Sequence, residues 1–256
     1  MAKTNERAAQ ARADAKAKAQ AAAQARERRT TVTIITVSLL VIAVFVGVVY
    51  FIANSSKAPA IADVHRPATA DDTGGLLIGA ANEGATRVDV YFDFLCPYCA
   101  VFEHGNGEML LAKSEAGDVA LYYHPLGFLD GYSNGTKYST RTANAAAVVA
   151  DRAPQALPGF VVALFANQPA EGGAGLTDAQ IADIAVGAGV PSDVAATFGD
   201  GEFTDWVAAA TQQASIDGIS STPSLMIDRE ILPQSAEVPW MQEGVLERYL
   251  LSVVGG

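Results

Sequence analysis

The chain has 256 residues, with 17 lysine and arginine residues against 28 aspartate and glutamate residues, and a formal net charge of −11. The first 30 residues hold eight basic and three acidic residues, whereas everything after residue 53 holds nine basic and twenty-five acidic ones. This strongly acidic C-terminal part argues against nucleic acids as partners, since binding to a phosphate backbone requires clustered cationic side chains. The length is enough for one or two domains with a substantial core.

Residues 31–53 form an uncharged apolar stretch between these two parts. At about 1.5 Å per residue, a helix of this length spans a hydrocarbon core of roughly 30 Å. A cleaved signal peptide is the alternative, because residues 58–60 (APA) resemble a cleavage site, but the apolar region of such a peptide is typically about 7–15 residues long. We therefore expect one transmembrane helix at 31–53, with the basic, alanine-rich arm of residues 1–30 in the cytoplasm and the C-terminal part outside it.

Residues 54–75 are small, polar and contain prolines, which is typical of a flexible tether between a membrane and a domain. From residue 76 to the end, patterns of strands and helices alternate. Strands are expected at 76–79, 86–95, 119–124 and 224–228, and helices at 96–111, 140–151, 157–167, 176–188, 202–215 and 239–253. This order predicts an α/β or α+β domain over 76–256, with a helical block at about 138–214 inserted into the middle of a sheet.

The only two cysteines, Cys96 and Cys99, follow directly after the apolar strand of residues 88–95. A cysteine at a helix start lies where free backbone N–H groups and the helix dipole stabilise a thiolate. Pro97 is preorganised for the first turn of that helix, which we expect to begin at the first cysteine. A strand, a C-x-x-C pair and a helix in this order favour thiol–disulfide exchange.

Two other uses of the cysteine pair are less favoured by the sequence. A structural zinc site needs about four ligands, and the only further candidates, His65, His104 and His124, are scattered along the chain. An inert structural disulfide across so short a loop would constrain the unfolded chain little. His104 and its neighbour Glu103 lie one to two turns along the helix, where we expect a solvated face.

Two separated motifs identify a family resemblance. Residues 93–99 (DFLCPYC) resemble the D-F-x-C-P-Y-C signature of DsbA-like thiol-disulfide oxidoreductases, and residues 218–224 (GISSTPS) resemble their G-V-x-G-T-P-x segment, which carries a cis-proline. The helical block between the motifs matches the helical insertion of that family. The resemblance covers roughly residues 73–253, and it implies an α/β thioredoxin fold with a helical insertion.

The resemblance also implies roles for single residues. Cys96 would be the exposed nucleophile and Cys99 the resolving thiol. Pro223 would be the cis-proline that faces the disulfide, and Thr222 would offer its backbone to an extended substrate peptide that pairs as an added strand. The family needs no cofactor beyond the redox-active disulfide and no metal.

The sequence departs from the family pattern near the cysteines. Thioredoxin and DsbA carry a buried acid six residues before the first cysteine, and this position is Val90. Asp93, on the other face of the strand, is a candidate proton acceptor for the second cysteine, although capping of the strand-to-helix turn is favoured. Pro97 and Tyr98 are expected to contact substrate. Because Tyr98 lacks the charge of a histidine, we expect a lowered pKa for the first cysteine, short of the value of about 3.5 in DsbA.

These implications combine into a functional hypothesis. The chain is expected to be a membrane-anchored, extracytoplasmic enzyme of a bacterial cell that introduces disulfides into secreted or cell-envelope proteins. A quinone-linked membrane protein, DsbB-like or vitamin K epoxide reductase-like, would reoxidise it. A reductase or isomerase of the same fold is one alternative, since threonine before the cis-proline also occurs in isomerase-type relatives. A non-catalytic thioredoxin-fold binding subunit is the alternative from a different class.

Overall fold

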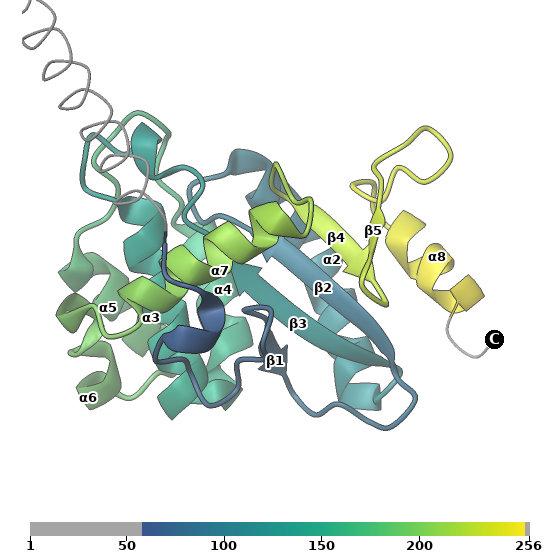
Figure 1. The fold of residues 1–256 in the computed structure, drawn as a ribbon, viewed down its shortest axis with the longest axis horizontal. Helices are drawn as coiled ribbons and strands as arrows, with labels where there is room; N and C mark the ends of the chain where they lie inside the picture. The colour runs from purple at the N-terminus through teal and green to yellow at the C-terminus, as the bar shows by residue number, and fades with distance from the viewer. Residues whose placement is uncertain (1–57, 254–256) are drawn as a thin grey trace, which may run out of the picture. The chain divides into compact units, whose positions relative to one another are not determined.

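A five-stranded mixed sheet forms the centre of the molecule in the computed structural model, which describes residues 58–253 (Figure 1). Its strands lie in the order β1-β3-β2-β4-β5. Their bounds are β1 Leu76–Ile78, β2 Thr86–Phe92, β3 Val119–Pro125, β4 Ser224–Ile227 and β5 Glu230–Leu232. The order agrees with the α/β class expected from the sequence.

The middle strand β2 carries the site. Its β-branched and aromatic residues suit a strand with both faces covered, and the run from Val88 to Phe92 is buried. β2 pairs in parallel with β3 and antiparallel with β4, so that Val90 lies between Tyr123 and Leu225. The carboxyl end of β2 therefore delivers the following turn to the edge of the sheet, next to the start of β4.

Seven α-helices surround the sheet within the described residues. They are α2 Pro97–Ala116, α3 Tyr138–Arg152, α4 Leu157–Ala166, α5 Asp178–Gly187, α6 Ser192–Ala195, α7 Thr204–Ile216 and α8 Val245–Val253. Figure 1 shows α7 in front of the sheet and α2 behind it. On one face of the sheet Val90 packs in the main core with Phe102 of α2, and on the other Tyr91 and Met226 pack near Ala214 of α7.

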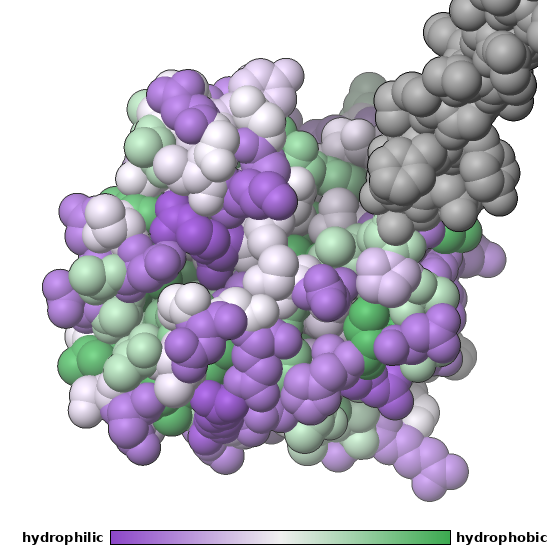
Figure 2. Space-filling model, turned by 60° about the vertical axis from the view of Figure 1, so that its left-hand side comes forward, coloured by the Kyte–Doolittle hydropathy of each residue, from purple (hydrophilic) through white to green (hydrophobic). Residues whose placement is uncertain are grey.

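The helical block between β3 and β4 is built around α3. Every residue from Ala143 to Ala150 is buried, and the small alanine side chains let neighbouring helices approach closely. Within the block, Asn144 accepts a hydrogen bond from Phe203 N at 2.8 Å and donates one to Phe198 O at 3.0 Å. On the side of this block seen in Figure 2, hydrophobic residues lie among hydrophilic ones without a large continuous patch.

The prediction of a flexible tether at 54–75 is wrong for residues 58–75. These residues belong to the compact unit that begins at Ala58, and Ile61, in the short 3₁₀ helix η1 (Ile61–Asp63), is buried in the main core. Asp71 accepts a hydrogen bond from the Arg87 side chain at 2.6 Å. One apolar anchor and one ion pair thus dock a segment whose composition resembles a linker.

Several element boundaries also differ from the sequence prediction. The last helix starts at Val245 instead of residue 239, the strand expected at 86–95 ends at Phe92, and the helix expected at 96–111 continues to Ala116. The strand β5 was not expected, because three residues are too few to show a period. No helix within residues 58–253 is long and apolar enough to cross a membrane. The predicted arm at 1–30 and the predicted membrane span at 31–53 lie outside the described residues.

Candidate active site

The turn between β2 and α2 is held by Asp93, which is completely buried. Its carboxylate accepts hydrogen bonds from Leu95 N at 2.9 Å and from Leu129 N at 2.8 Å, and its carbonyl oxygen accepts one from Cys96 N at 3.0 Å. Burial raises the pKa of Asp93 to about 6. Because these bonds go to backbone amides of the turn and the neighbouring loop, the geometry favours the capping role over the proton-acceptor role.

The two cysteines occupy different environments at the start of α2. Cys96 is the N-cap residue with an extended backbone, so that the helix begins one residue later than predicted, at Pro97. Both thiols are free, and Cys96 is 6% exposed while Cys99 is 1% exposed. Cys96 is less open than expected, yet it lines a surface groove that Cys99 does not reach.

The surroundings lower the pKa of one thiol and raise that of the other. The pKa of Cys96 falls to about 6, chiefly because the Cys99 thiol donates a hydrogen bond to it, with smaller contributions from the Thr222 side chain and the backbone N–H groups of Cys99 and Tyr98. Burial raises the pKa of Cys99 well above its ordinary value, and the nearby Cys96 sulfur raises it further. The pair therefore combines a thiolate at neutral pH with a neutral thiol behind it.

The loop before β4 completes the site opposite the cysteines. The Thr222–Pro223 peptide bond is cis. The Thr222 carbonyl oxygen lies 3.3 Å from Cys96 Sγ and accepts the hydrogen bond of its thiol. The two sequence motifs, whose contacting residues Cys96 and Thr222 lie 126 positions apart, thus meet at the Cys96 sulfur.

A groove of about 510 Å³ opens at this junction. It is lined by Cys96, Pro97, Tyr98, Phe128, Leu129, Glu171, Ser220, Ser221 and Thr222. Tyr98 is 70% exposed, as suits a residue that meets a partner. Pro223 is not among the lining residues. Of these lining residues the sequence predicted Cys96, Pro97, Tyr98 and Thr222. It did not indicate Ser220 and Ser221 of the second motif, or Phe128, Leu129 and Glu171, which come from loops without a recognisable pattern.

Gln168 is a second contributor that the sequence did not indicate. Its side-chain amide donates to Phe94 O at 2.9 Å and to Cys96 O at 3.0 Å. Gln168 follows α4 in the helical block, so it ties that block to the turn that carries the nucleophile. A single polar residue after a helix gives no sequence signal for such a long-range contact.

The expectation of a solvated face holds only in part at Glu103, which is partly buried. The Glu103 side chain folds back over Gly107, where a Cβ atom would meet the Glu103 carboxylate. Burial raises the pKa of Glu103 to about 7. His104, the next residue, is exposed as expected. Gly107, one turn along the helix, leaves room for this placement of the Glu103 side chain. The spacing of residues on a helix does not indicate such a local gap.

Replacing Thr222 by valine should raise the Cys96 pKa from about 6 toward roughly 7, because valine keeps the shape and removes the hydroxyl hydrogen bond to the thiolate. The pKa is measured from the thiolate absorbance at 240 nm against pH. Ser221→Ala, in the same loop, is the matched control and should leave the pKa unchanged. An unaltered pKa in Thr222→Val would show that the hydroxyl does not act on the thiolate.

Replacing Glu103 by glutamine should stabilise the protein above neutral pH. Because the folded pKa is raised, the protonated carboxyl is favoured at low pH, and this advantage is lost as the pH rises through about 7. We expect Glu103→Gln to raise the free energy of unfolding by roughly 2 kcal/mol at pH 8 and by little at pH 5. Urea unfolding at the two pH values measures this, and an equal effect at both would contradict the assignment.

Comparisons with known proteins agree with this geometry. A protein-family model described as thioredoxin matches residues 72–243. The reduced DsbA of Mycobacterium tuberculosis has 27% identity, a TM-score of 0.60, and covers 72% of this chain and 93% of its own. The reduced disulfide bond oxidoreductase DsbG of the same organism has 28% identity, a TM-score of 0.60, and covers 73% and 90%. The serine/threonine-protein kinase PknE of M. tuberculosis is 32% identical to this chain over 115 residues. This match spans 43% of the chain but only 20% of the kinase.

Proposed function

The chain belongs to the thioredoxin family and is a DsbA-like protein thiol-disulfide oxidoreductase, and from this premise we propose that it acts as a disulfide donor to secreted or cell-envelope proteins. The thioredoxin-type α/β fold and the enzyme class expected from the sequence are thereby confirmed. One observation supports this direction of electron flow: the pKa of Cys96 is lowered, whereas the pKa of Cys99 is raised.

The proposed reaction begins from the Cys96–Cys99 disulfide. A substrate thiolate attacks Cys96 Sγ, the sulfur that lines the groove, and the Cys99 sulfur leaves as a thiolate that takes up a proton. A second substrate thiolate then attacks the substrate sulfur of the mixed disulfide, and Cys96 leaves as a thiolate. Two electrons pass from the substrate to the cysteine pair, and the substrate gains one disulfide.

The low pKa of Cys96 suits the second step. A stabilised Cys96 thiolate is a good leaving group in the second step, because exchange is faster when the leaving thiol has a low pKa. It also stabilises the reduced form of the enzyme and thereby makes the disulfide more oxidising. Cys99 is buried and has a raised pKa, so it stays protonated. A protonated thiol attacks the mixed disulfide only slowly, which leaves time for the second substrate thiolate to react.

The groove provides a place for an extended peptide. Thr222 lies at its edge, and a substrate segment that pairs with this backbone would be added as a strand next to the cysteines. Tyr98 and Phe128 line the same groove as Cys96 and offer apolar contacts. We therefore propose that substrates are unfolded or extended segments around a cysteine.

The expected anchor and partner complete the proposal. An uncharged stretch at 31–53 behind a basic arm would hold the enzyme in the cell membrane with its catalytic domain on the extracytoplasmic side. A quinone-linked membrane protein, DsbB-like or vitamin K epoxide reductase-like, would then reoxidise the cysteine pair. Alkylation of Cys96 in intact cells by a membrane-impermeant reagent tests the placement, and protection from that reagent until lysis would contradict it.

The direct test of the proposed function is oxidative refolding. The oxidised enzyme should form disulfides in a reduced, unfolded ribonuclease faster than glutathione disulfide at equal concentration, with one disulfide formed per enzyme disulfide consumed. Insulin reduction by the reduced enzyme is the counter-assay. Slow oxidation of ribonuclease together with fast insulin reduction would overturn the donor assignment in favour of a reductase.

A further inference from the structure

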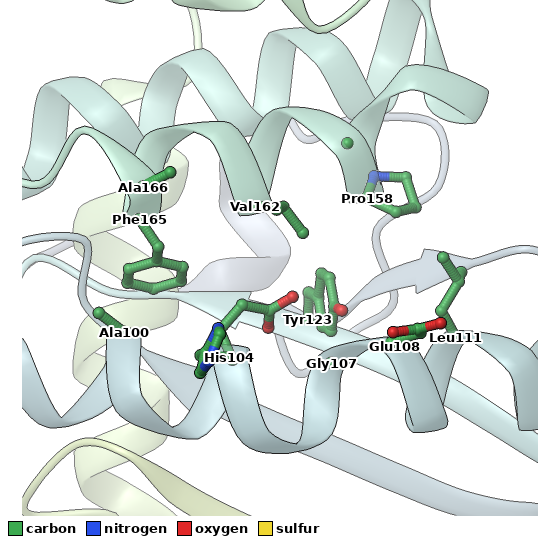
Figure 3. Close-up of a pocket in the computed structure, with 12 residues that line it drawn as sticks. Ala100, His104, Gly107, Glu108, Leu111, Tyr123, Pro158, Val162, Phe165 and Ala166 are labelled. Carbon is green, nitrogen blue, oxygen red and sulfur yellow. The ribbon is translucent and has the colours of Figure 1, made fainter.

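A pocket of about 620 Å³ lies between α2 and α4 (Figure 3). Its walls are mainly apolar, with Leu111 from α2 and Pro158, Val162 and Phe165 from the start and body of α4. Val162 is 53% exposed, so this apolar wall is accessible to a ligand from the solvent. The volume falls within the range of about 300–1,000 Å³ that is usual for small-molecule sites.

One partly buried acid lies in this apolar setting. Glu103 lines the pocket, and its carboxylate rests over Gly107, which has no side chain to push it aside. Within residues 58–253, no hydrogen bond and no ion pair reaches this carboxylate. A carboxylate that is partly removed from water and has no partner is destabilising, and burial is the only cause that raises its pKa. A ligand that brought a positive charge would supply the missing partner.

The other polar groups of the pocket decide which charge it accepts. Figure 3 shows Tyr123 reaching from the sheet into the space between the helices, while His104 and Glu108 lie along α2. α4 contributes no charged residue, and neither lysine nor arginine lines the pocket. An anion would meet two carboxylates, and a neutral apolar molecule would leave Glu103 unpaired. A cation is the ligand that satisfies the site.

We propose that this pocket binds a small amphiphilic amine, whose ammonium group pairs with Glu103 and whose apolar body packs against Leu111, Val162 and Phe165. The pocket shares no lining residue with the groove at the cysteines. Glu103 lies one helical turn beyond Cys99 on α2, so the site is next to the redox helix without including either sulfur. Binding is therefore independent of the proposed disulfide transfer.

The binding test uses 4-phenylbutylamine, with 4-phenyl-1-butanol as a neutral probe of nearly the same shape. Calorimetry is carried out on residues 58–256, a compact unit whose sheet and core are formed by its own residues. At pH 8 the amine should bind at least about tenfold more tightly than the alcohol, since a charge-assisted hydrogen bond adds to the same apolar contact. The preference should shrink at pH 5.5, where Glu103 is protonated and the amine remains charged.

Variants locate the site. Glu103→Gln should reduce amine affinity to that of the alcohol, whereas Glu115→Gln, which removes the same charge from an exposed position of α2, should leave it unchanged. Val162→Lys places a tethered ammonium at the exposed wall and should block the amine while the protein stays folded. Cys96→Ser should bind normally even if disulfide transfer is lost. Equal binding of amine and alcohol by the natural sequence, or undiminished amine binding in Glu103→Gln and Val162→Lys, would overturn the proposal.

Discussion

Replacing Cys96 by serine should abolish disulfide transfer, with a loss of at least about a thousandfold in the rate of substrate oxidation. Cys96 is the only sulfur that lines the groove, and its pKa of about 6 makes it a thiolate at neutral pH. Cys99 cannot take over, because it is 1% exposed and its pKa is raised. The rate is measured as thiol loss from a reduced, unfolded ribonuclease.

The companion variant Cys99→Ser should keep a reactive Cys96 thiolate that attacks a disulfide of a substrate protein and releases one substrate thiolate. Because the variant cannot form the Cys96–Cys99 disulfide that would release the other substrate sulfur, we expect long-lived mixed disulfides between Cys96 and substrate proteins, visible by intact mass or on non-reducing gels. Urea unfolding of both variants serves as the control, since a misfolded protein would also be inactive. Full activity of a folded Cys96→Ser variant would contradict the mechanism, as would a Cys99→Ser variant that carries no substrate.

The second large effect concerns stability in the two redox states. The Cys96 thiol has a folded pKa of about 6 against an ordinary value of 9.0. A lowered folded pKa contributes stability that is fully present above the unfolded pKa and is lost as the pH falls through the folded pKa. Only the reduced protein has this thiol. Its free energy of unfolding, minus that of the oxidised protein, should therefore rise by roughly 2 kcal/mol between pH 6 and pH 8.

Taking the difference in the free energy of unfolding between the reduced and oxidised proteins cancels the contributions of the other titrating groups. Asp93 and Glu103 have raised pKa values, but they are present in both forms and their effects cancel to first order. Urea unfolding with and without reductant, at pH 6, 7 and 8, gives the two curves. Cys96→Ser under reducing conditions should lose the excess slope. Parallel pH dependences for the reduced and oxidised proteins would show that the thiolate is not stabilised by the fold.

The elements nearest the chemistry could be predicted from the sequence because they have strong local signals. A β-branched and aromatic run, followed by a C-x-x-C pair with a proline at the second position, specifies a strand, a turn and a helix start. The second motif contains Pro223, and the structure brings the carbonyl oxygen of the residue before it, Thr222, to 3.3 Å from Cys96 Sγ. The pairing of these motifs came from the family resemblance, since no local rule joins residues so far apart.

The rest of the site depends on long-range contacts that have no local pattern. Gln168 bonds to the carbonyl oxygens of Phe94 and Cys96 from a helical block more than seventy residues away. Glu103 is partly buried because Gly107 leaves room on the same helix and because it faces α4 across a pocket, and neither fact is contained in the spacing of charged residues. The docked segment at 58–75 has the composition of a linker and is fixed by Ile61 and Asp71.

The reduction potential of the Cys96–Cys99 pair, equilibrated in glutathione buffers, tests the central claim most directly. A stabilised Cys96 thiolate favours the reduced form, so we predict a potential of about −120 to −180 mV, the range of known disulfide donors and isomerases. Thr222→Val should move the potential to a more negative value, in step with the rise in the Cys96 pKa. A potential near about −270 mV, as in thioredoxin, would contradict the account and identify the protein as a reductase.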